Sequence, residues 1–166
     1  MREDKLEITG PDLRGQRGHL PWVLQEAPNW VSRSAAKRPS PVLSTCPVVS
    51  CPNGWVGYQE KCYYFAKAEG SWTSSKKYCS SLNATLAVVD SQEEMDFMLR
   101  YKGPADHWIG LQRNGSQPWK WINGTIFNEW FAVLGGGSCA YMNQQGIASS
   151  SCLREEPWIC IKPVER

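Results

Sequence analysis

Trp108-Ile-Gly-Leu111 is the stretch of sequence that decides the fold. It is short and wholly apolar, and polar turn residues bound it, which predicts a central strand buried on both faces. Downstream, Trp119-Lys-Trp121 alternates and leads into Asn123-Gly124, the strongest short signal for a β-hairpin. We therefore expect strands on both sides of that turn, with Asn123 exposed.

Two helices are expected upstream of the central strand. Apolar residues recur at helical spacing from Trp72 onward, which predicts an amphipathic helix that ends before Asn83 and points Cys79 inward. Ser91-Gln-Glu-Glu94 is a capping box that begins a second helix, and Gly103-Pro104 ends it. One side of the second helix is predicted to carry Met95, Met98, Leu99 and Lys102.

The remaining elements are predicted to be short strands and one long loop. Residues 55–65 alternate loosely and are rich in aromatics, as expected of a two-stranded hairpin, and residues 85–89 predict a short buried strand. From residue 128 to 151 the pattern decays into Gly- and Ser-rich segments, which predicts a long irregular stretch of the kind that is often functional. Residues 158–160 predict the last strand.

Composition places one folded domain in the C-terminal part of the 166-residue chain. All six Tyr, all four Phe and seven of the nine Trp lie at or after Trp55, whereas residues 1–50 hold six of the eleven prolines. We expect residues 1–50 to be a disordered or stalk-like segment without a transmembrane helix, and residues 51–163 to be the domain. Residues 51–166 carry eleven basic and eleven acidic side chains, which argues against nucleic-acid binding.

The seven cysteines indicate either a disulfide framework or a metal site. There is no Cys-x-x-Cys, the intervals are long and irregular, and only His19 and His107 could add imidazole, so we expect disulfides and no metal or other cofactor. Three glycosylation sequons, at Asn83, Asn114 and Asn123, fit an extracellular setting.

The beginning of the chain shows no segment that would carry the protein to an extracellular setting. No apolar signal-peptide segment follows Met1, and the longest charge-free stretch, residues 39–59, is interrupted by four prolines. We expect that a membrane-anchoring segment was lost through alternative splicing, truncation or an erroneous gene model. A genuinely cytosolic protein is the alternative.

With these elements in hand, the chain resembles the C-type lectin-like domains from Cys51 to roughly Lys162. The motifs that carry the resemblance are Cys51-Pro-x-x-Trp55, the helical Cys79, Trp108-Ile-Gly-Leu111, Trp121-Ile-Asn-Gly124 and Trp158-Ile-Cys160. The resemblance implies an α+β fold, with two helices packed on short antiparallel sheets, a long loop region and three disulfides. It pairs Cys51 with Cys62, Cys79 with Cys160, and Cys139 with Cys152.

Within that family, residues 100–111 and 118–125 are most similar to the Clr, osteoclast inhibitory lectin and lectin-like transcript group. This resemblance implies a type II membrane protein at the plasma membrane, whose extracellular domain is recognised by a lectin-like receptor on natural killer cells. The expected function is therefore a calcium-independent protein ligand in immune regulation, and a carbohydrate-binding lectin is the alternative.

The family's calcium motifs are missing from this sequence. Sugar-binding members hold calcium between Glu-Pro-Asn or Gln-Pro-Asp in the long loop and Trp-Asn-Asp before the penultimate cysteine. Residues 131–152 contain no Asp or Glu, and Ser149-Ser-Ser151 stands where Trp-Asn-Asp is expected. Calcium-dependent sugar binding is thus not expected, and glycan contact without calcium stays open.

Catalysis is not expected either. No catalytic triad is expected, because one of the two histidines lies in the N-terminal segment and the other, His107, is expected to pack beside Trp108. Glu155 and Glu156 are adjacent, and neighbours on an extended strand point to opposite sides. The sequence therefore predicts no enzyme and no catalytic residues.

Recognition is left to exposed side chains on the long-loop face. By spacing from the flanking cysteines, the resemblance implies the partner-binding residues Tyr141, Gln145, Ser151, Leu153, Arg154, Glu155 and Glu156. Four tryptophans are interpreted as core instead: Trp119, Trp121, Trp130 and Trp158. Cys46 is unpaired in the six-cysteine frame and is predicted to link two copies into a homodimer, with a free thiol or a fortuitous residue of the tail as the alternative.

Overall fold

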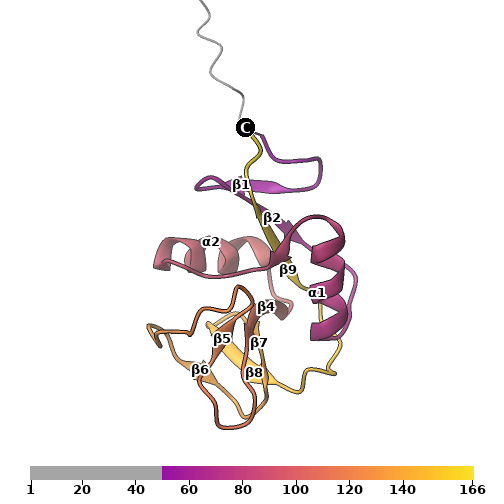
Figure 1. Cartoon of the computed structure of the whole chain (residues 1–166). Coiled ribbons are helices and arrows are strands. Elements are labelled where there is room, and N and C mark those ends of the chain that lie inside the picture. The colour runs from indigo at the N-terminus through magenta and orange to yellow at the C-terminus, as the bar shows by residue number, and fades with distance from the viewer. Residues whose placement is uncertain (1–49) are drawn as a thin grey trace, which may run out of the picture. The chain divides into compact units, whose positions relative to one another are not determined.

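The computed structural model describes residues 50–166. In this range the chain forms two helices and nine short strands (Figure 1). In chain order they are β1 (Val56–Tyr58), β2 (Lys61–Phe65), α1 (Trp72–Ser81), β3 (Thr85–Leu86), α2 (Gln92–Lys102), β4 (His107–Gln112), β5 (Lys120–Trp121), β6 (Val133–Leu134), β7 (Cys139–Met142), β8 (Ile147–Ser150) and β9 (Ile159–Pro163).

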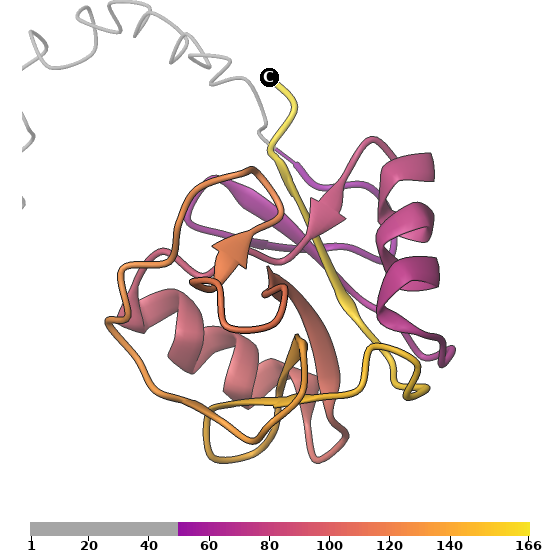
Figure 2. The ribbon, with the colours of Figure 1, turned by 60° about the horizontal axis from the view of Figure 1, so that its bottom comes forward.

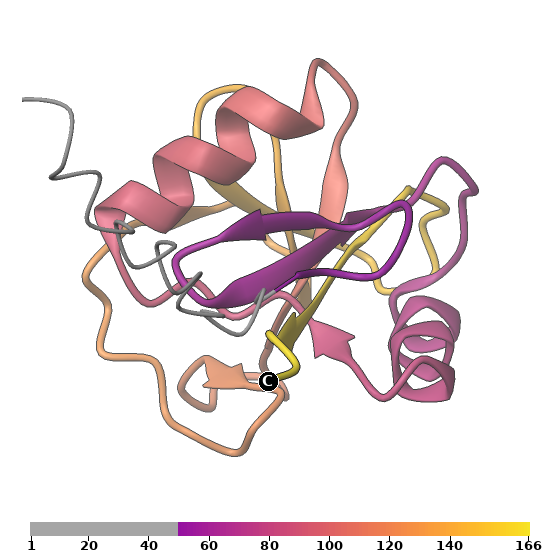
Figure 3. The same cartoon turned by 90° about the horizontal axis from the view of Figure 1, so that it is seen from above.

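The first sheet is antiparallel, with the strand order β1-β2-β9-β3. The hairpin predicted over residues 55–65 is confirmed, because β1 pairs with β2. β9 pairs with β2 from Phe65 to Lys61, so the last strand lies beside the first hairpin (Figure 3). The helices α1 and α2 lie on opposite sides of β9 (Figures 1 and 2). The predicted α+β architecture, with two helices on short antiparallel sheets, is confirmed, except that β6 and β8 pair in parallel.

The second sheet has the order β5-β4-β7-β8-β6, and β4 is its most deeply buried strand. His107 to Leu111 are all buried, as predicted for the central strand. Ile109 and Leu111 belong to the larger hydrophobic core, whereas Trp108 belongs to a second core that contains Trp72 and Trp158. Since alternate residues of a strand point to opposite faces, β4 separates the two cores and contributes to both.

At Gly110, β4 closely approaches the residues that follow β3 and β5. The N–H of Gly110 donates to the carbonyl of Ala87 at 2.7 Å, and its carbonyl accepts the N–H of Ile122 at 2.8 Å. A Cβ atom at this position would lie 2.8 Å from the carbonyl oxygen of Leu86. Any side chain here would therefore push the backbones apart.

Both helices begin at serine caps. The Ser71 hydroxyl accepts the N–H of Ser74, and the Ser91 hydroxyl accepts the N–H of Glu94 at 3.2 Å. The predicted capping box is thus present, although the Glu94 carboxylate accepts the N–H of Asp90, at 2.9 Å, one residue before the cap. On the predicted inner side of α2, three residues are buried and Leu99 is half-buried; the buried three are Met95, Met98 and Lys102.

The buried Glu94 carboxylate also joins α2 to the first sheet. Lys61 of β2 donates to Glu94 at 2.5 Å and to Asp90 at 2.8 Å. Burial lowers the pKa of Lys61, but the hydrogen bonds to Asp90 and Glu94 outweigh it and raise the pKa above its ordinary value. The ion pair therefore keeps the lysine charged where the helix meets the sheet.

All three implied disulfides are confirmed. Cys79–Cys160 joins α1 to β9, and it closes the longest loop, with a sequence separation of 81. Cys51–Cys62 braces the entry hairpin. Cys139–Cys152 joins the beginning of β7 to the segment that follows β8.

The prediction of one long irregular stretch over residues 128–151 is wrong. Three of the nine strands lie in it: β6, β7 and β8. β7 and β8 contain small and hydroxyl residues, including the buried Ser149, which have weak strand preference on their own. These strands form because they pair with neighbouring strands of the sheet. Gly135 and Gly137 allow the chain to pass close to β8, because a Cβ at either position would collide with the backbone of Ser149 or Ser150.

Two smaller expectations also need correction. The strand predicted over residues 85–89 is only Thr85–Leu86, although Ala87 to Val89 are buried. Within the described residues, the Asn123-Gly124 turn has a strand only before it, and the chain after it makes a single bridge, from Ile126 to Lys120. Three of the four tryptophans interpreted as core are buried, but Trp130 is 36% exposed.

His107 is a buried titratable group at the beginning of β4. Its Nδ1 lies 2.9 Å from the carbonyl of Ala105, and its ring stands edge-on to Phe65. Burial lowers the pKa of His107, the charge of Lys102 lowers it further, and the Ala105 carbonyl and Asp106 only partly offset this. The folded protein therefore favours the neutral imidazole.

We expect His107 to make the protein less stable in mild acid. Because its pKa is lower in the folded state, the unfolded chain takes up the proton first, and the free energy of unfolding falls as the pH drops below about 6.5. Urea unfolding midpoints from pH 8 to pH 5 measure this slope. His107→Gln should flatten it, and an unchanged slope in the variant would assign the effect to other groups.

Candidate partner-binding surface

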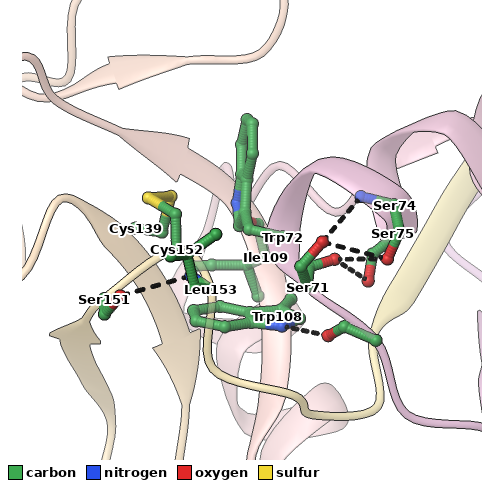
Figure 4. Close-up of a disulfide and its surroundings, with 11 residues drawn as sticks. Ser71, Trp72, Ser74, Ser75, Trp108, Ile109, Cys139, Ser151, Cys152 and Leu153 are labelled. Atoms are coloured by element: carbon green, nitrogen blue, oxygen red, sulfur yellow. Dashed lines mark hydrogen bonds between the residues drawn. A yellow bond between two sulfur atoms is a disulfide. The ribbon is translucent and has the colours of Figure 1, made fainter.

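The segment that follows Cys152 is held at both ends by backbone hydrogen bonds. At its beginning, the N–H of Trp72 donates to the carbonyl of Cys152 at 3.0 Å. At its end, Gly70 and Glu156 exchange two N–H···O bonds of 3.0 Å each. Residues 153–155 form a short loop between these points, which we call the tethered loop. Figure 4 shows its first residue, Leu153, beside the Cys139–Cys152 disulfide.

Two buried tryptophans pack beneath the residues that hold the tethered loop. The indole N–H of Trp108 donates to the carbonyl of Gly70 at 2.9 Å, and that of Trp72 donates to the carbonyl of Ile109 at 2.8 Å (Figure 4). Both rings are nearly inaccessible to solvent. Because buried indoles with satisfied N–H groups have few alternative positions, the base of the loop is rigid.

Arg154 is the centre of a cluster of charged and aromatic groups. Its Nη2 lies 2.8 Å from a carboxylate oxygen of Asp106, and its Nε lies 2.6 Å from one of Glu156. Its guanidinium also covers the ring of Tyr141, with 4.7 Å between Cζ and the ring centroid. The guanidinium of Arg154 is therefore already paired within the molecule.

The acids around Arg154 outnumber it. Partial burial raises the pKa of Glu156; Arg154 opposes this, while the charges of Asp106 and Glu69 add to it. Glu155, next to Glu156, is exposed. The cluster thus presents a net negative field toward solvent.

Leu153 is the most exposed large apolar side chain in residues 50–166, at 83%. The hydroxyl of Ser151 accepts its N–H at 3.3 Å, and the carbonyl of Ser151 accepts the N–H of Arg154 at 3.1 Å. Ser151 therefore shapes the turn that projects Leu153 outward.

Gln145 does not join this cluster. It lies in the turn between β7 and β8, where the side-chain oxygen of Asn143 accepts the N–H groups of Gln145 and Gly146. Together with Met95 and Leu99 of α2, Gln145 lines a groove of about 280 Å³. Of the seven predicted residues, the structure brings Tyr141, Ser151 and residues 153–156 together and places Gln145 elsewhere.

Two further residues belong beside the predicted set. Asp106 pairs with Arg154 although 48 positions separate them. Leu134, 65% exposed, shares a row across the sheet with Ala148 and Tyr141. Neither residue carries a local signal, because strand pairing across the sheet and a long-range ion pair place them here.

The residues present do not fit a calcium ion. No group of three or more His, Cys, Asp or Glu side chains in residues 50–166 lies close enough to hold a metal. Asn143 already uses its side-chain oxygen in its own turn, and Ser149 is buried and donates to the carbonyl of Leu134. The loop region thus lacks the several carboxylates that calcium normally takes.

The model of one protein family, the lectin C-type domain, matches residues 67–162. The chain belongs to the C-type lectin domain family. The chain is 51% identical over 119 residues to human C-type lectin domain family 2 member D, and 46% identical over 116 residues to human early activation antigen CD69. These matches cover 72% and 70% of this chain, and 62% and 58% of the respective relatives.

Solved structures agree with the fold. The carbohydrate-recognition domain of mouse scavenger receptor C-type lectin superposes with a TM-score of 0.65 at 25% identity, covering 70% of this chain and 98% of that one. The C-type lectin domain of murine dendritic cell inhibitory receptor 2, solved in complex with N-glycan, gives 0.63 at 28% identity, covering 69% and 99%. Domains of this family are recognition modules.

Several sequence predictions concern other parts of the surface. Asn83, Asn114 and Asn123 are all exposed, as glycosylation requires. No helix in residues 50–166 is both long and apolar enough to cross a bilayer. Cys46, with its predicted interchain bond, lies outside the described residues, as does the predicted stalk apart from Ser50.

Proposed function

We propose that this domain is a calcium-independent recognition module at the cell surface that serves as a protein ligand for a lectin-like receptor of natural killer cells. The observation that carries the proposal is the tethered loop, which projects Leu153 into solvent from a rigid base. Protein interfaces concentrate their energy in a few such anchors within a polar rim. We place the domain, residues 51–163, outside the plasma membrane, as the similarity to the Clr and lectin-like transcript group suggests.

The chemistry of the loop supports a protein partner over a calcium-held sugar. Leu153 offers an apolar anchor, and the half-buried ring of Tyr141 lies under the guanidinium of Arg154. Arg154 is paired with Asp106 and Glu156, so the exposed carboxylate of Glu155 is the charge that the loop presents to a partner. A partner surface with an apolar pocket and basic neighbours complements this arrangement.

Receptor binding by substituted proteins tests the proposal. The chain, secreted from mammalian cells behind an added signal peptide, is passed over a panel of immobilised lectin-like killer-cell receptors in surface plasmon resonance. We expect Leu153→Ser and Glu155→Lys each to weaken binding about tenfold, which corresponds to about 1.4 kcal/mol. Glu93→Lys, at an exposed acid on α2, is the matched control and should change the affinity less than twofold.

A chelator separates this proposal from the carbohydrate-binding alternative. Receptor affinity is expected to be the same with calcium and with EDTA, because the loop region offers no calcium ligands. Sugar binding by the same protein is measured on a glycan array, with calcium and with EDTA. Sugar binding that disappears with EDTA, together with no binding to any receptor of the panel, would overturn the proposal.

A further inference from the structure

A second surface feature lies beside the Asn123-Gly124 turn. It is a groove of about 340 Å³, and its lining includes Asp90, Asn123, Ile126, Asn128 and Trp130. None of these residues belongs to the partner-binding surface. The size is at the lower end of the range for sites that hold a small molecule, of the order of 300 Å³.

The groove exposes apolar surface next to polar groups. Ile126 is 61% exposed and Trp130 is 36% exposed, and both are among the few large apolar side chains that face solvent in residues 50–166. Asn128 and Asp90 are exposed at the same groove. An aromatic face with an amide and a carboxylate nearby suits a pyranose ring, which has one face of C–H groups and a rim of hydroxyls.

The turn at the rim of this groove is also a glycosylation sequon. The side-chain oxygen of Asn123 accepts the backbone N–H of Thr125, at 2.9 Å, and the Thr125 hydroxyl. Since both hydrogen bonds use the oxygen, the amide nitrogen Nδ2 of the exposed Asn123 is the atom left for modification. Glycosylation joins Nδ2 to C1 of a sugar carried on a lipid pyrophosphate; Nδ2 loses a proton and the lipid pyrophosphate leaves.

We propose that the N-linked glycan of Asn123 folds back into this groove and acts as a structural part of the domain. Its first N-acetylglucosamine covers Trp130 and Ile126, and its polar groups reach Asn128 and Asp90. The attachment point makes this sugar a tethered ligand at a high effective concentration, so a weak stacking contact is sufficient to keep it in place.

Two single-sequon proteins test the proposal. One keeps only Asn123, through Asn83→Gln and Asn114→Gln, and the other keeps only Asn114, through Asn83→Gln and Asn123→Gln. Asn114 is the matched control, because it is exposed but does not line the groove. Both are secreted from cells that make only high-mannose glycans, and mass spectrometry confirms occupancy. Melting is then measured before and after enzymatic removal of the whole glycan from the folded protein.

We expect glycan removal to lower Tm by about 4 °C in the Asn123-only protein and by less than 1 °C in the Asn114-only protein. Trimming to a single N-acetylglucosamine should preserve most of the effect. Adding Trp130→Ala to the Asn123-only protein should abolish it, because the sugar then has no ring to stack on. An unoccupied Asn123, equal shifts in the two proteins, or an unchanged shift with Trp130→Ala would each overturn the proposal. None of these results depends on receptor binding.

Discussion

Replacing Cys79 and Cys160 together by serine is expected to lower the free energy of unfolding by about 4.5 kcal/mol. The bond closes a loop with a sequence separation of 81, and its loss frees the unfolded chain from that constraint. Both cysteines are fully buried, so the serine hydroxyls also need new partners. Against a typical total stability of 5–15 kcal/mol, this loss removes between about a third and nearly all of the stability.

Urea unfolding followed by far-UV circular dichroism measures the effect, with the secreted yield as a second readout if the variant does not fold. Cys51→Ser/Cys62→Ser is the control, because its loop spans a sequence separation of only 11 and its loss is expected to cost about 3 kcal/mol. Equal losses in the two double variants would contradict the loop-length explanation.

Gly110→Ala is expected to cost roughly 3 kcal/mol, which is large for the addition of one methyl group. The new Cβ would lie 2.8 Å from the Leu86 carbonyl oxygen and 2.9 Å from a methyl carbon of Ile122. One of these neighbours is backbone, so the clash cannot be relieved by a rotamer change. Moving the strands apart would also weaken the hydrogen bonds that Gly110 makes to Ala87 and Ile122.

Gly136→Ala is the matched control, because its added Cβ has no neighbour within 4 Å and its φ is ordinary. It is expected to change the free energy of unfolding by less than about 0.5 kcal/mol. Urea midpoints of the two variants provide the comparison. A Gly110→Ala protein as stable as Gly136→Ala would show that β4 and the neighbouring strands can separate at low cost.

The fold could be predicted where a local pattern and the tertiary environment agree. Trp108 to Leu111 is apolar at every position, and the structure buries that strand on both sides. Ser91 and Glu94 carry a cap signal that needs only a few neighbouring residues. Such features depend on residues close in sequence, so they are visible without the structure.

The strands β7 and β8 could not be predicted in the same way. Ala140, Ala148 and Ser149 have little tendency to form strands, and they do so because neighbouring strands cover them. Trp130 is expected in the core because of its size, but it is partly exposed and lines two grooves. The pairing of β7 and β8 and the exposure of Trp130 both depend on contacts between distant segments.

Part of the candidate surface could be predicted from the sequence, but Asp106 could not. Tyr141 and residues 151–156 can be placed by their distance from Cys139 and Cys152, because the disulfide fixes these segments relative to each other. Asp106 reaches Arg154 from before β4, and no spacing rule connects the two. The charge of the surface therefore emerges only in the folded molecule.

In the tethered loop, the side chains of the proposed partner-binding surface are distinct from the backbone bonds that hold the loop in place. Its ties use backbone atoms of Gly70, Trp72, Cys152 and Glu156, so they do not depend on the side chains at positions 153–155. Mutations at Leu153 and Glu155 can therefore accumulate at little cost in stability, whereas Arg154 is constrained by its ion pairs with Asp106 and Glu156. If this surface binds a receptor as proposed, its specificity can change through a few codons while the scaffold stays unchanged.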